Sequence, residues 1–210
     1  MAIVNGYVSL DELKTYIGLS GSGQDDNLEN AIEGASRLID KVTGRKFWQD
    51  SSVVAKYYTP IHDVYLMVDD ISTTTGLVVQ LDTTDDGSYD TTLTLDTDFI
   101  LKPLNPEHIG AQGGTEYYAP FNELNILTTR SDERFDHLIP KNVKIQAKWG
   151  YAIVPEAIKQ ATLIQALRFF KRKDTPFNVF GNEQTGQQEL FNKIDPDAMQ
   201  LIKGYIKHKL

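Results

Sequence analysis

Hydrophobic residues recur every three or four positions in the opening part of the chain and again towards its end, which is the spacing of amphipathic helices. The first helix is expected to begin at Ser9, because Ser9 and Glu12 have the spacing of a capping box. The second is expected to begin at Asp25 or Asp26 and to end at Gly44, a residue suited to the left-handed conformation that closes a helix.

A long helix is expected to follow Pro155, and its pattern is apolar on nearly all sides. At about 100° per residue, its apolar residues fall on three sides, and these sides are Ala157, Ala161 and Ile164; Leu163, Leu167 and Phe170; and Ile158, Ala166 and Phe169. Such a helix must be covered nearly all round, by its own chain or by a neighbouring subunit. Ile158, Leu163, Phe169 and Phe170 are therefore candidates for a subunit interface.

Between these helical parts the pattern changes to short runs rich in β-branched and aromatic residues, which predict strands. The six expected strands are residues 53–58, 64–68, 77–81, 91–95, 124–129 and 143–149. Asp85-Asp86-Gly87-Ser88 predicts a hairpin turn between the third and the fourth. Residues 103–120 are expected to form a looser connection, so this part of the chain predicts a small antiparallel sheet or barrel.

The order of these elements predicts an α+β protein. Residues 1–47 and 149–210 are expected to form a small helical bundle, and residues 48–148 an inserted antiparallel β domain. Near the end of the chain, residues 175–188 are polar and predict a loop. Asp195-Pro196 then predicts the start of a last helix.

The composition of the 210 residues, 40% hydrophobic and 24% charged, is that of an ordinary globular protein. The chain has no cysteine, which excludes disulfides and thiolate zinc sites and fits a reducing cytosol. No apolar run approaches the roughly 18 residues of a membrane-spanning helix. The first residues also lack the pattern of a signal peptide, so we expect no membrane partner.

The net charge of −8 is unevenly distributed along the chain. Residues 51–150 carry 15 acidic and 7 basic side chains, whereas residues 151–210 carry 6 acidic and 9 basic ones. An acidic chain is a poor candidate for tight binding to nucleic acid, although it can lie beside DNA without gripping it. The basic and aromatic run at residues 45–48 could stack on bases, but a packed exit from a helical bundle is the favoured interpretation.

No residues mark a catalytic or cofactor site. An acidic group in the predicted β domain could hold a cation, but its spacing does not match a calcium loop and is typical of solvated turns; its members are Asp82, Asp85, Asp86, Asp90, Asp96 and Asp98. The four histidines lack the spacing of a zinc helix; they are His62, His108, His137 and His208. The sequence therefore predicts no enzyme, no metal and no cofactor.

The two ends of the chain together carry a resemblance to a known family. The first part of the pattern is residues 7–19, 25–26 and 40–47, and the second is residues 150–151, 154–161 and 168–172. In combination these segments resemble the head–tail connector, or adaptor, proteins of tailed bacteriophages.

The resemblance implies a structural part of a virion, made in the cytoplasm of the host bacterium. Members of the family form a ring, typically of twelve copies, beneath the portal of a DNA-filled capsid. The ring extends the DNA channel, through which DNA passes without specific binding, and it provides the docking platform for the stopper or tail. The expected partners are therefore the portal protein, a stopper or tail protein, and further copies of the chain.

The resemblance also suggests where the portal is bound, because the C-terminal segment of family members commonly reaches it. The candidate portal contacts are Ile194, Met199, Ile202, Tyr205 and Ile206. The family has no catalytic residues to carry over. Two alternatives from other classes stay open: a carbohydrate- or protein-binding module that uses the β insertion, and a hydrolase that uses acids of the insertion.

Overall fold

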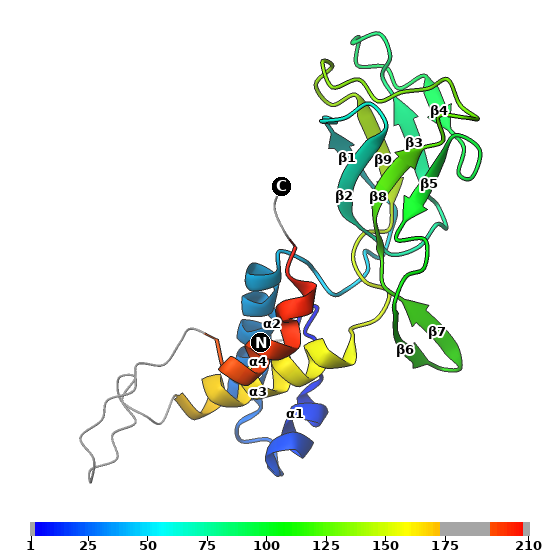
Figure 1. The fold of residues 1–210 in the computed structure, drawn as a ribbon. Helices are drawn as coiled ribbons and strands as arrows, with labels where there is room; N and C mark the ends of the chain where they lie inside the picture. The colour runs from blue at the N-terminus through cyan, green and yellow to red at the C-terminus, as the bar shows by residue number, and fades with distance from the viewer. Residues whose placement is uncertain (1–2, 173–193, 208–210) are drawn as a thin grey trace. The chain divides into compact units, whose positions relative to one another are not determined.

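The computed structural model describes residues 3–172 and 194–207, and Figure 1 shows the order of its helices and strands. The α+β class predicted from the sequence is confirmed. The predicted loop at residues 175–188 lies outside the described residues.

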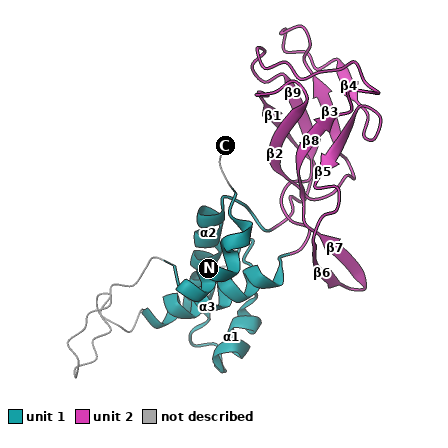
Figure 2. Ribbon diagram, viewed as in Figure 1, with its two compact units in different colours: residues 1–47, 154–210 teal, residues 48–153 magenta. Residues whose placement is uncertain are grey.

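The chain divides into two compact units, coloured separately in Figure 2. Unit 1 comprises residues 1–47 and 154–210, and unit 2 comprises residues 48–153. Each unit has a hydrophobic core of its own.

The helices of the described residues all belong to unit 1. They are α1 (Leu10–Ile17), α2 (Asp25–Thr43), α3 (Glu156–Arg172) and α4 (Pro196–Ile202), followed by the short 3-10 helix η1 (Lys203–Tyr205). Helix α3 packs against α1, α2 and α4. These neighbours bury four apolar residues of α3, namely Ile158, Ala161, Leu163 and Ala166, and leave its other apolar residues partly exposed.

Three helix ends carry the capping residues that the sequence predicted, namely Ser9, Gly44 and Asp195. Helix α2 begins after Gln24, whose side chain makes no capping hydrogen bond, so the expected aspartate cap is absent there. The N–H of Glu12 donates to Ser9 Oγ at 3.1 Å, and the Glu12 carboxylate accepts from the N–H of Ser9 at 2.6 Å. Gly18 and Gly44 close α1 and α2 at φ 67° and 68°, a conformation that costs glycine little. Asp195 caps α4 by accepting from the N–H of the second residue after it at 2.9 Å.

Unit 2 consists of antiparallel sheets. Its strands are β1 (Val54–Tyr58), β2 (Tyr65–Ile71), β3 (Val78–Leu81), β4 (Thr91–Leu93), β5 (Phe99–Lys102), β6 (His108–Gln112), β7 (Thr115–Tyr118), β8 (Phe121–Ile126) and β9 (Val143–Ala147). The sheet orders are β1-β9-β3-β4, β2-β8-β5 and β6-β7. Side chains from both larger sheets form one core, and within residues 48–153 neither sheet closes into a barrel.

The six predicted strands correspond to β1, β2, β3, β4, β8 and β9, and the predicted turn joins β3 to β4. Strand β5 was missed. The expectation of a looser connection over residues 103–120 was wrong, because β6 and β7 form a hairpin there. Gly113 and Gly114, at φ 59° and 81°, make its turn. A Gly-Gly pair is a hairpin signal that the sequence did contain.

The predicted boundary at residue 149 also needs correction, because residues 149–153 belong with the strands. Trp149 is fully buried in the core of unit 2, and its indole N–H donates to the carbonyl of Val54 at 2.8 Å. The N–H of Gly150 donates to the carbonyl of Asp70 at 2.7 Å. These contacts join residues far apart in the sequence, so the local hydrophobic pattern around residue 149 does not reveal them.

We expect Leu124→Ala to lower the free energy of unfolding of unit 2 by about 2–5 kcal/mol, because the truncation leaves a cavity in a packed core. Leu124 is fully buried on the central strand of its sheet. Both tryptophans of the chain, Trp48 and Trp149, lie in unit 2, so tryptophan fluorescence during urea denaturation reports this unit. Leu138→Ala, at a residue that is 77% exposed, is the matched control. Equal unfolding midpoints for the two variants would contradict the assignment of the core.

Candidate functional site

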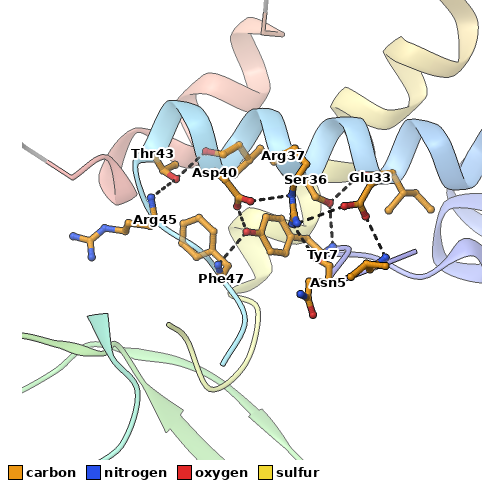
Figure 3. A network of polar contacts seen from close by, with 12 residues as sticks. Asn5, Tyr7, Glu33, Ser36, Arg37, Asp40, Thr43, Arg45 and Phe47 are labelled. Carbon is orange, nitrogen blue, oxygen red and sulfur yellow. Dashed lines mark hydrogen bonds and ion pairs between the residues drawn. The ribbon is translucent and has the colours of Figure 1, made fainter. Parts of the chain in front are cut away.

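Tyr7 connects the beginning of the chain to α2 and to the segment that follows it (Figure 3). Its hydroxyl donates to the carboxylate of Asp40 and accepts from the N–H of Phe47 at 3.0 Å. Its own N–H donates to Ser36 Oγ at 3.2 Å. Tyr7 therefore joins the start of the chain, α2 and the segment that follows α2. Its side chain is almost fully buried.

Arg37 reinforces the same junction from its surface side (Figure 3). Its guanidinium forms ion pairs with Asp40 at 3.0 Å and with Glu33 at 3.4 Å. It also donates to the carbonyl of Asn5 at 3.0 Å, and the Glu33 carboxylate accepts from the N–H of Val4 at 3.3 Å. The residues that precede α1 are therefore bound to α2 through both backbone and side chains.

The end of α2 is joined in turn to the C-terminal segment. Arg45 Nε donates to the carbonyl of Tyr205 at 2.8 Å, and the N–H of Lys207 donates to the carbonyl of Thr43 at 2.7 Å. The ring of Tyr205 packs edge-on against the buried ring of Phe47, with 5.6 Å between the centroids. Phe47, in the run at residues 45–48, therefore packs where the chain leaves the helical bundle. This is the interpretation that the sequence favoured over base stacking.

Burial governs the protonation of this junction. It raises the pKa of the Tyr7 hydroxyl, and the hydrogen bond to Asp40 raises it further, so Tyr7 keeps its proton and remains a donor. Burial also raises the pKa of Asp40, while the Tyr7 hydroxyl and Arg37 lower it. Tyr7 therefore limits the cost of keeping an ionised carboxylate in a partly desolvated position.

Tyr7→Phe is expected to lower the free energy of unfolding of unit 1 by about 1–3 kcal/mol, because Phe47 N–H and the Asp40 carboxylate lose their buried partner. Far-UV circular dichroism, which is dominated by helix, measures the loss during urea denaturation. Tyr16→Phe, at a residue that is 46% exposed, serves as the control and should be neutral.

The loss should also depend on pH. Without the hydroxyl, the folded-state pKa of Asp40 rises further above its unfolded value, so the variant loses stability as the pH rises through that pKa. The difference from wild type should therefore be larger at pH 7 than in mildly acidic solution. A difference that does not change with pH would contradict the role given to Asp40.

The four candidate interface residues of α3 lie in different environments. Ile158 is fully buried in unit 1, so in this packing it offers no surface to a neighbouring subunit. Leu163 is 8% exposed, and Phe169 and Phe170 are half-buried. The ring of Phe169 packs over Gly34 of α2, which leaves part of its surface uncovered.

The candidate portal contacts divide in the same way. Ile202 is fully buried against the bundle and cannot contact a partner in this packing. The others are half-buried, namely Ile194, Met199, Tyr205 and Ile206. Helix α4 packs against α3, and the N–H of Asp195 donates to Gln165 Oε1 at 2.9 Å. The segment is thus held on the bundle while keeping some apolar surface.

Asp82 and Asp86, two members of the acidic group of unit 2, accept hydrogen bonds from the backbone of a turn. The Asp82 carboxylate accepts from the N–H groups of Gly87 at 2.9 Å and Thr84 at 3.3 Å, and Asp86 accepts from the N–H of Ser88 at 2.7 Å. Within residues 3–172 and 194–207, no group of three or more His, Asp or Glu side chains is placed to hold a metal ion. The same residues contain no helix long and apolar enough to cross a membrane.

The structure defines a class of fold: a helical bundle built from both ends of the chain, with a unit of antiparallel sheets inserted between its second and third helices. The bundle carries a polar junction at Tyr7 and a C-terminal segment anchored to it.

Particular solved structures share this fold. A chain from the neck of an empty gene transfer agent (GTA) particle, computed with C6 symmetry, aligns with a TM-score of 0.52 and 12% identity. A chain from the neck of a native GTA particle, computed with C12 symmetry, gives 0.50 and 13%, and one from the virion of a native GTA particle gives 0.51 and 14%. Each alignment covers 100% of this chain and 94% of the other.

At these identities the likeness establishes a common fold. No protein-family model matches the chain, and no curated protein matches it in sequence. The alignments span unit 1 and unit 2 together, so the insertion is part of the shared architecture.

Proposed function

We propose that this chain is a head–tail connector of a tailed phage or phage-like particle: a structural protein that forms a ring beneath the portal. The observation that carries the proposal is the full-length match to chains from GTA necks and virions. The bundle-plus-insertion architecture is shared along the whole chain, and the sequence pattern of both ends independently resembles the connector family.

Symmetry supports a ring of identical copies. The matched necks were computed with C6 and C12 symmetry, and a ring of twelve copies fits either. In the proposal, twelve copies extend the DNA channel of the portal and provide the platform for a stopper or tail protein. The net charge of −8 suits a channel through which DNA slides, because a strongly basic lining would bind phosphates.

The C-terminal segment is the proposed contact with the portal. Its half-buried apolar residues are Ile194, Met199, Tyr205 and Ile206. Anchoring by Arg45 and Lys207 fixes this segment on the bundle, which lowers the entropy lost when a partner binds it.

The direct test uses heads assembled without this chain, from the genome that encodes it. Purified full-length chain added to these heads should form a ring on the portal vertex, seen by electron microscopy, and should restore the joining of tails. If no ring forms and particles mature normally without the chain, the proposed function is wrong.

Ile206→Asp should weaken binding to these heads by about tenfold or more, because it places a charge in an apolar contact. Binding is measured by co-sedimentation of the labelled chain with the heads. Gln200→Ala, at an exposed residue of α4, is the control and should bind as wild type does. Unchanged far-UV circular dichroism for both variants excludes unfolding as the cause. Wild-type affinity of Ile206→Asp would remove this segment from the portal contact.

A further inference from the structure

An open groove of about 460 Å³ runs between α1 and the first half of α3. Val8 and Leu163 supply apolar side chains to it, and both are nearly buried. Tyr16, also in its lining, is 46% exposed. The groove therefore offers apolar surface that the described part of unit 1 leaves partly open.

The charged side chains of this groove are mainly acidic. Asp11, Glu12 and Glu156 line it and are exposed. Lys159 is the one basic residue of the lining, and its ammonium lies 3.9 Å from the Glu12 carboxylate. The surface thus combines an apolar strip with excess negative charge, which suits a partner that is both apolar and basic.

The opposite end of α3 has that complementary character. Lys171 and Arg172 form its basic last turn and are exposed, and the half-buried ring of Phe170 precedes them. The residues of α3 that line the groove run from Glu156 to Leu163, so the basic turn lies about 12–24 Å further along the helix axis. Because both surfaces belong to one rigid helix, the basic end of a copy cannot reach its own groove.

We propose that the acidic groove of one copy receives the basic end of α3 from the next copy, so that Phe170 meets the apolar strip while Lys171 and Arg172 face the carboxylates. The two surfaces differ and lie at opposite ends of one helix. A contact between them can repeat head-to-tail from one copy to the next, and such a contact can close into a ring. This inference rests on the proposed ring and identifies its subunit contact.

The test exchanges the charges of the two surfaces. Variant G reverses the groove (Asp11→Lys, Glu156→Lys), and variant T reverses the helix end (Lys171→Glu, Arg172→Glu). Glu12 is left unchanged because it caps α1. Each variant alone brings like charges together, so its occupancy on heads assembled without the chain should fall about tenfold or more.

Mixing G and T in equal amounts should restore rings, because in an alternating ring every groove meets a helix end of opposite charge. A single chain carrying all four changes should assemble as well. Wild type is the positive control, and urea denaturation followed by circular dichroism establishes that each variant is folded. Ring occupancy is counted by electron microscopy and by quantitative gel analysis of purified particles.

Each outcome is decisive. Restoration in the mixture supports the contact. Rings formed by G or T alone, with wild-type occupancy, overturn it while leaving the proposed function intact. If ring occupancy falls for both variants and the mixture does not restore it, the two surfaces contact another partner, such as the portal. This result also overturns the proposed contact between copies. Failure of wild type to form rings overturns the proposed function itself.

Discussion

The hydroxyl of Tyr7 joins parts of the helical unit that are distant in the sequence. It joins a carboxylate on α2 to the backbone of Phe47, and Phe47 in turn supports the ring of Tyr205. The start of the chain, the end of its second helix and its C-terminal segment thus share one small polar junction inside an apolar unit. Buried polar groups that are satisfied in this way select one arrangement of the surrounding elements, because any other leaves them without partners.

Around this junction, α3 has two roles that its sequence combines. Its first half supplies buried residues such as Ile158 and Ala161 to the unit, and its two ends carry charges of opposite sign. An acidic first turn and a basic last turn suit the helix dipole of any helix. In a proposed ring protein, the same distribution gives each copy two different surfaces that match each other.

Local signals in the sequence were sufficient for much of the fold. Ser9, Gly18 and Gly44 mark helix ends through contacts within a few residues, and Asp85-Asp86-Gly87-Ser88 marks its turn in the same way. The junction at Tyr7 could not be predicted, because its partners lie 33 and 40 residues away and no local pattern records them. Whether Ile158 and Ile202 are buried or exposed likewise depends on which helices cover them. Hydrophobic periodicity does not specify the covering helices.

The division of the chain has a consequence for how such a protein can change over generations. The covalent chain passes between the units at two places, after residue 47 and after residue 153, and the two cores have no residue in common. A recombination event with its ends at these two places exchanges the whole insertion as a cassette. The Tyr7 junction and α3 are inherited unchanged in such an exchange, so one helical unit can acquire different insertions.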